Sequence, residues 1–246
     1  MPRISAYHRP VGVSEALALL HRPGVRSVVL GGGTSVVPQR TEVATEVIDL
    51  QALGLGSVSP ASGRVALGAM ATLDMVSESA LVPDAVRESA RREQPSTLRT
   101  LATIGGTVVA GDGESELLAA LLAFDAVVTL VNRDGSQQRR LDDVLADPSV
   151  LDGGIVTAVT IETSGVAAAA RTGRTPMDSP IVAVVARRRP DGSIVAAMSG
   201  VATTARVVED PAGLEPPGDF RGSTEYRRML GVELAARVAT ALEVLA

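Results

Sequence analysis

Two glycine-rich segments contain the residues that are best suited to binding a ligand. The segment 103–107 places paired glycines between β-branched residues, and the segment 31–35 has three glycines followed by two hydroxyl side chains. Glycine lacks a Cβ atom, so a ligand can approach the backbone closely, and converging N–H groups of a tight turn attract an anion without a cationic side chain. This matters because the chain contains no lysine. The two turns could clamp a diphosphate from opposite sides.

The same glycine pattern is also typical of tight turns with a purely structural role, and both interpretations stay open at this point. The spacing does not match the dinucleotide fingerprint of the Rossmann fold. With Gly31 and Gly33 as the first two glycines, the third position falls on Val36. The absence of lysine also excludes a phosphate-binding P-loop.

No other cluster predicts a catalytic residue or a metal ligand. His8 and His21 are the only histidines, and they lie in a segment without paired carboxylates, so we expect surface histidines. Asp142 and Asp143 precede an apolar pair, a pattern typical of a helix start. Arg187 begins a run of three arginines, which predicts a solvated strand end or a docking surface for an acidic partner.

Strands and helices are expected to position both turns. An apolar run over 25–30 predicts the strand that leads into the first turn, and Pro95 ends a predicted helix over 84–93 ahead of the second. Thr72 is expected to cap a helix, and Asp134-Gly135 predicts a β-hairpin. Further predicted strands cover 46–50, 64–69, 126–131, 138–141, 155–161, 181–187 and 194–201. Further predicted helices follow a cap at Ser14, cover 114–124, and run to Leu245 from a cap at Ser223 or Thr224.

Composition limits the classes of function. The chain has 246 residues, of which 46% are hydrophobic, so it can build an ordinary globular core. A net charge of −5 argues against nucleic acid as a partner. The absence of cysteine excludes disulfides, thiolate chemistry and an Fe–S cluster held by this chain alone. We find no signal-peptide pattern and no apolar window of membrane-spanning length, so a cytoplasmic location is expected.

The order of several motifs resembles one known family, the FAD-binding (medium) subunit of molybdenum hydroxylases of the carbon monoxide dehydrogenase and xanthine dehydrogenase type. The resemblance extends over nearly the whole chain. No single motif is specific, whereas the ordered set is. The motifs that carry it are 31–35, 67–73, 94–99, 103–107, 115–117, 199–202 and 223–228.

This resemblance implies an α+β fold. A two-subdomain FAD-binding fold similar to that of vanillyl-alcohol oxidase (PCMH type) would be followed by a C-terminal α+β domain similar to that of the carbon monoxide dehydrogenase flavoprotein. The implied FAD-binding domain covers 1–152, with subdomains of about 1–54 and 55–152, and the C-terminal domain covers 153–246.

By the same resemblance, the two turns and one acid bind FAD, and no catalytic residue or metal ligand is implied. Three of these positions depart from the usual family residues. Ser35 replaces an aspartate, Thr107 replaces an asparagine, and Glu116 replaces the shorter acid; each keeps hydrogen-bonding capacity with a different reach. The implied FAD-binding residues are Gly31, Gly32, Gly33, Thr34, Ser35, Thr103, Ile104, Gly105, Gly106, Thr107 and Glu116.

The implied function is that of the FAD subunit of a molybdenum-hydroxylase-type oxidoreductase. It would take electrons from a 2Fe–2S small subunit and pass them through FAD to NAD, a quinone or oxygen. A large subunit with the molybdenum cofactor would carry out the hydroxylation. Two alternatives stay open: a stand-alone FAD-dependent oxidoreductase, and a degenerate family member that has lost FAD and acts as a non-catalytic binding module.

Overall fold

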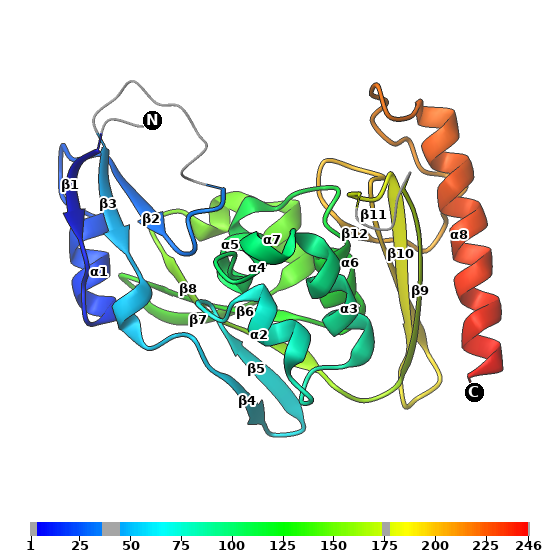
Figure 1. Ribbon diagram of the computed structural model, residues 1–246, viewed down its shortest axis with the longest axis horizontal. Coiled ribbons are helices and arrows are strands. Elements are labelled where there is room, and N and C mark those ends of the chain that lie inside the picture. The colour runs from blue at the N-terminus through cyan, green and yellow to red at the C-terminus, as the bar shows by residue number, and fades with distance from the viewer. Residues whose placement is uncertain (1–3, 36–44, 174–177, 246) are drawn as a thin grey trace.

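Three β-sheets follow one another along the chain (Figure 1) in the computed structural model, which describes residues 4–35, 45–173 and 178–245. The first sheet is parallel, with β3 (Thr45–Asp49) between β1 (Ile4–His8) and β2 (Ser27–Leu30). Helix α1 (Val13–Leu20) joins it in a small apolar core. Since β2 ends at Leu30, this sheet holds the start of the segment 31–35 in place.

The middle sheet is antiparallel and has the strand order β4-β5-β8-β6-β7. The hairpin predicted at Asp134-Gly135 joins β6 to β7, with Asn132 opposite Gly135. Gly135 has a φ of +116°, a conformation that favours glycine. The strands are β4 (Val58–Ala61), β5 (Arg64–Gly68), β6 (Val127–Asn132), β7 (Gly135–Arg140) and β8 (Ile155–Glu162).

Apart from the β6–β7 hairpin, the sequence between β5 and β8 is largely helical, and its helices supply about half of the central core. Thr72 caps α2 as predicted, since its hydroxyl accepts the Met75 N–H at 3.2 Å. Helix α6 is buried along its whole length, because it lies between α3 and the third sheet. These helices are α2 (Leu73–Glu78), α3 (Asp84–Glu93), α4 (Ser96–Arg99), α5 (Ile104–Ala110), α6 (Glu116–Ala123) and α7 (Leu141–Ala146). The short 3-10 turn η1 (Gln51–Leu53) precedes β4, and a second one, η2 (Pro148–Leu151), precedes β8.

The third sheet is antiparallel and lies between two helices. Its order is β12 (Arg206–Val207), β11 (Ile194–Ser199), β10 (Val182–Arg188) and β9 (Val166–Thr172). The long helix α8 (Thr224–Val244) covers its outer face (Figure 1), and Ser223 caps this helix as predicted. Val184 packs in the core under α8 and Val185 packs in the central core with α6. Burial on both faces explains the continuous apolar run of β10.

Three local predictions are wrong. The segment 103–107 is not an isolated tight turn, because Thr103 caps α5 and the glycines lie in the first turn of that helix. Ser14 does not cap α1, which begins one residue earlier after Gly12. Arg187 is not solvated: it is 1% exposed, its guanidinium stacks 5.2 Å from the centre of the Phe124 ring, and Asp125 pairs with it.

Candidate functional site

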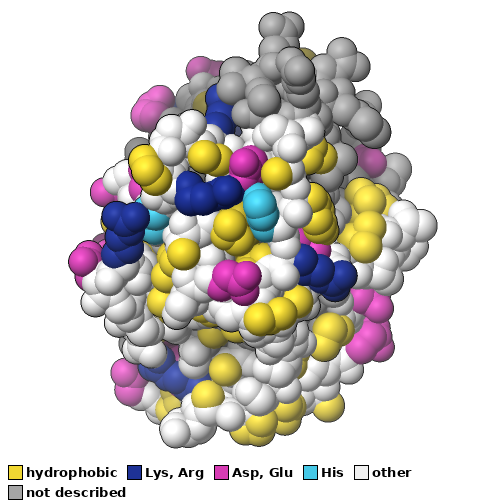
Figure 2. Space-filling model, turned by 90° about the vertical axis from the view of Figure 1, so that its left-hand side faces the viewer, with side chains coloured by type: hydrophobic (Ala, Val, Ile, Leu, Met, Phe, Trp, Pro, Cys, Tyr) yellow, Lys and Arg dark blue, Asp and Glu magenta, His cyan; other side chains and the backbone are white. Residues whose placement is uncertain are grey.

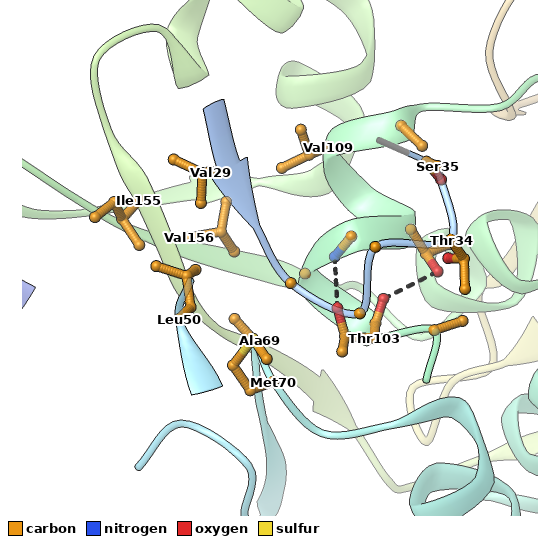
Figure 3. A pocket seen from close by; sticks show the side chains of 18 of the residues that line it. Val29, Thr34, Ser35, Leu50, Ala69, Met70, Thr103, Val109, Ile155 and Val156 are labelled. Atoms are coloured by element: carbon orange, nitrogen blue, oxygen red, sulfur yellow. Dashed lines mark hydrogen bonds between the residues drawn. The ribbon is translucent and has the colours of Figure 1, made fainter. Parts of the chain in front are cut away.

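A cleft of about 470 Å³ is lined by both glycine segments (Figure 3). This volume lies within the range of about 300–1,000 Å³ typical of ligand pockets. The segment 31–35 and the start of α5 form its polar side. Aliphatic residues from the ends of β2, β3 and β5 and from the start of β8 form the other side, and no aromatic side chain lines it in the part of the chain that the structure describes. These aliphatic residues are Val29, Leu50, Ala69, Met70, Ile155 and Val156.

Close packing at Gly31 and Gly32 and the backbone conformation of Gly33 favour glycine in the first segment. A Cβ atom on Gly32 would overlap the carbonyl oxygen of Leu101, and a Cβ on Gly31 would lie 2.9 Å from Thr103 Oγ1. Gly33 has a φ of +78°, which L side chains rarely adopt. The segment 31–33 is therefore pressed against the chain that enters α5. These glycines therefore have a structural role, and this role is compatible with ligand binding by the same segment.

Free hydrogen-bond donors are concentrated in the first segment. The backbone N–H groups of residues 31–35 donate to no acceptor within 4–35, 45–173 and 178–245. Unpaired N–H groups at a concave surface are suited to an anion.

The start of α5 offers fewer donors than its sequence predicts. Ile104 N–H donates to Ala71 O at 3.0 Å, Gly105 N–H donates to Ala69 O at 2.9 Å, and Gly106 N–H donates to Thr103 Oγ1 at 3.2 Å. The prediction that this segment leaves its backbone N–H groups uncovered is therefore wrong for residues 104–106, because α5 uses these groups to fix itself beside β5. The cleft is lined by Thr103, which caps α5, and by Gly105, Gly106, Thr107, Val109 and Ala110 of α5 (Figure 3 shows Thr103 and Val109). The Thr107 hydroxyl donates to Thr103 O at 3.2 Å.

Two predicted site residues lie outside the cleft lining. Ile104 is fully buried in the central core. Glu116 is 3% exposed, and its carboxylate lies 3.3 Å from Arg92 Nη1 and 3.2 Å from Arg171 Nε. Both oxygens of Glu116 thus face arginines of α3 and β9. The structure brings Gly31, Gly32, Gly33, Thr34, Ser35, Thr103, Gly105, Gly106 and Thr107 together and leaves these two apart.

The cleft also contains two carboxyl groups that sequence reasoning did not single out, Glu93 and Asp112. Burial raises the pKa of Glu93 to about 7, hydrogen bonds from Ser115 and Leu117 lower it in part, and the nearby Asp112 and Glu116 raise it. No arginine lines the cleft within the described ranges. Glu93 directly precedes the motif 94–99, and only this proximity in sequence could have drawn attention to it.

The histidines lie on the end of the molecule formed by the first sheet and α1, which Figure 2 shows with charged and hydrophobic side chains interspersed. His8 Nε2 lies 2.7 Å from Glu46 Oε2, and His21 Nε2 lies 2.8 Å from Gly153 O. Each histidine therefore has a partner within the protein, and both side chains are half-buried. Among the described residues, no group of three or more His, Cys, Asp or Glu side chains could hold a metal ion.

Comparison with known proteins identifies the family. Residues 3–162 match the family described as FAD binding domain in molybdopterin dehydrogenase. The chain belongs to this family. It is an oxidoreductase subunit of the FAD-binding type found in molybdenum hydroxylases, and FAD is the cofactor of the family, so the predicted resemblance and cofactor are confirmed.

Three relatives differ in how much of this chain they match. The uncharacterized protein YgfM of Escherichia coli (strain K12) is 30% identical over an alignment of length 251 that covers 95% of this chain and 94% of that protein. The carbon monoxide dehydrogenase medium chain of Afipia carboxidovorans is 30% identical over 139 residues, covering 53% of this chain and 48% of that one. The nicotinate dehydrogenase FAD-subunit of Eubacterium barkeri is 30% identical over 149 residues, covering 56% and 49%.

Solved structures share the fold of the whole chain. Cyanide-inactivated Cu,Mo-CO dehydrogenase superposes with a TM-score of 0.90 at 23% identity, covering 100% of both chains. Quinoline 2-oxidoreductase from Pseudomonas putida 86 gives a TM-score of 0.84 at 19% identity, covering 97% of this chain and 96% of that one. The predicted α+β fold is confirmed. None of the described helices is both long and apolar enough to cross a membrane.

Proposed function

We propose that the cleft binds FAD and that the chain is the flavin subunit of a multi-subunit molybdenum-hydroxylase oxidoreductase. FAD, when bound, supplies the electron transfer between a 2Fe–2S partner subunit and an acceptor such as NAD, a quinone or oxygen. A large partner subunit would hold the molybdenum cofactor. Because this chain has no cysteine, the Fe–S cluster must lie in a partner. The chain's own residues place the cofactor, and none is assigned as an acid or a base.

The N–H groups of residues 31–35, which donate to no acceptor among the described residues, carry the proposal. They would donate to the diphosphate, with the hydroxyls of Thr34 and Ser35 beside them. Thr103 accepts from Gly106 N–H, so its hydroxyl proton remains available to a ligand oxygen. The aliphatic side of the cleft fits a flat ring that lies on side chains such as Val29 and Val156. The donor set and the lining therefore fit FAD.

Ile104 and Glu116 remain predicted FAD-binding residues, although neither lines the cleft. Ile104 anchors the start of α5 in the core. Glu116 ties α6 to α3 and β9 through its arginine partners. We propose that both support the cleft by packing and ion pairing.

The charge of the cleft favours a second candidate function. In this alternative the chain no longer binds FAD and acts as a non-catalytic binding module. Glu93 and Asp112 line the cleft, and no described lining residue is cationic. A diphosphate would enter a site with negative charge already present, which costs free energy unless a proton or counterion compensates it. Retention of FAD by the purified chain would exclude this candidate.

The test compares the wild type with a variant that adds a charge to the turn. Thr34→Glu places a carboxylate among the donors of residues 31–35, and Ser136→Glu makes the same change on exposed β7. Each protein is mixed with FAD and passed through gel filtration, and the bound flavin is quantified from its visible absorption. We expect one FAD per chain for the wild type and Ser136→Glu, and a loss of at least tenfold in affinity for Thr34→Glu. Equal retention by all three would contradict the proposed site.

The partners are tested in the assembled complex. We expect a tagged chain isolated from its native host to carry iron and molybdenum in amounts comparable to its own, measured by metal analysis. A flavin-loaded chain isolated without either metal would contradict the proposed assembly.

We also propose that the chain divides into a FAD-binding unit and a C-terminal unit. The predicted division falls at 152/153. Strand β8 (Ile155–Glu162) pairs with β5 and β6 in the middle sheet, and the family match ends at residue 162, so we place the division directly after β8.

A further inference from the structure

Glu93 lies where the cleft meets a smaller pocket. It is the last residue of α3, and it lines both the cleft and an adjoining space of about 60 Å³ together with Gln94 and Asp112. Its Oε2 accepts the Leu117 N–H at 3.2 Å, so the side chain also holds the start of α6. Glu93 is therefore fixed at the cleft by a hydrogen bond that an oxygen of either the ionised or the protonated carboxyl can accept.

The cations near Glu93 already face other carboxylates. Arg92 on α3 lies 3.4 Å from Glu88 and 3.3 Å from Glu116, and Arg171 on β9 lies 3.2 Å from Glu116. Glu114, in the loop before α6, pairs with Arg221 and lies 3.6 Å from Arg227. Glu93 forms no ion pair with any described residue. The groups that act on its carboxyl are Asp112 and Ser115 from the loop and Glu116 from α6. Arg92 from α3 and Glu114 from the loop line the same adjoining space.

We propose that Glu93 takes up a proton when a diphosphate-bearing ligand binds the cleft, so that ligand affinity falls as the pH rises above neutrality. This inference rests on the proposed function. The bound proton removes one of the two carboxylate charges that line the cleft, those of Glu93 and Asp112, and the balance is one solvent proton taken up for each ligand bound. The raised pKa of Glu93, about 7 and caused mainly by burial, supports it, because protonation near neutral pH then costs little.

A pH series of FAD affinity tests the proposal. The Kd is measured by flavin fluorescence for the wild type, Glu93→Gln and Asp84→Asn between pH 6 and 8.5. Glutamine keeps an oxygen that can accept the Leu117 N–H, and Asp84→Asn removes the same charge from an exposed position at the other end of α3. We expect the wild-type and Asp84→Asn Kd to rise by up to about tenfold per pH unit above pH 7, and the Glu93→Gln Kd to stay constant.

Calorimetry counts the proton directly. Titration of FAD at pH 8 in two buffers with different ionisation enthalpies is expected to show close to one proton taken up by the wild type and none by Glu93→Gln. A wild-type Kd that does not change with pH would overturn the role of Glu93 while leaving FAD binding intact. The same conclusion would follow if the pH dependence of the Kd persisted in Glu93→Gln and disappeared in Asp112→Asn. Failure of the wild type to bind FAD at any pH would refute the proposed function and this inference together.

Discussion

Gly105 and Gly106 provide a matched test of how closely α5 packs beside β5. Both residues lie in the first turn of α5 and both line the cleft. A Cβ on Gly105 would lie 2.8 Å from Ala69 Cβ and 2.9 Å from Ala69 O, whereas a Cβ on Gly106 would meet only Thr103 Oγ1, at 3.1 Å. Ala69 is 2% exposed and accepts the Gly105 N–H, so it has little room to move. We expect Gly105→Ala to be the damaging change.

The pair separates packing from helix propensity. Alanine in place of glycine inside a helix gains about 1 kcal/mol, and this gain is common to both variants. Overpacking against backbone costs about 1–3 kcal/mol, and only Gly105→Ala incurs it. The free energy of unfolding of Gly105→Ala should therefore be about 1–3 kcal/mol below that of Gly106→Ala, a Tm difference of about 2–12 °C for a chain of this size.

Thermal and urea unfolding of the wild type and the two variants, followed by circular dichroism, measure this difference. Gly106→Ala is expected to be as stable as the wild type or more stable, and Gly105→Ala less stable than both. Equal Tm values for the two variants would refute the close approach of α5 to residue 69, and with it the account of why glycine occupies position 105.

Three further changes test other parts of the structure. Between pH 4.5 and 7, the free energy of unfolding of the wild type, measured in urea, should fall by about 2–3 kcal/mol relative to that of Glu93→Gln. The reason is that the raised pKa of Glu93, about 7, stabilises the folded state only while the carboxyl is protonated. A difference between the two proteins that is constant with pH would contradict this. Asp125→Asn leaves the buried Arg187 without its charged partner and should cost about 3–5 kcal/mol in urea unfolding, and a loss below about 1 kcal/mol would show that the pair matters little. Thr103→Ala removes the hydroxyl that caps α5 and should lower stability by about 0.5–2 kcal/mol, whereas Thr103→Ser should not; equal Tm losses for both would exclude the cap.

Local signals predicted much of the fold. Asp134-Gly135 gave a hairpin because glycine accepts the positive φ that the turn needs. Thr72 and Ser223 gave helix starts because their hydroxyls accept N–H groups that the first helical turn leaves unpaired. The five residues of the first glycine segment were predicted to share one site with the second, and both segments line the same cleft.

The errors arise where partners lie far apart in sequence. Paired glycines favour a turn over a helix by local propensity, yet α5 forms because Ala69 and Ala71 accept its first N–H groups. Arg187 belongs to a charged run, and its burial depends on Asp125, which lies 62 positions earlier. Glu93 lines the cleft because the fold brings the end of α3 beside the loop before α6. None of these contacts has a local sequence signal.

We propose that the backbone N–H groups of residues 31–35, which have no acceptor in the part of the chain that the structure describes, bind the diphosphate of FAD. The most direct measurement is a titration of the ¹⁵N-labelled chain with FAD, followed by amide NMR. We expect the largest shifts at Gly31, Gly32, Gly33, Thr34 and Ser35, with smaller ones at Ile104 and Gly105, whose N–H groups keep their acceptors in the chain. Saturable binding with unchanged amides at 31–35 would contradict the account.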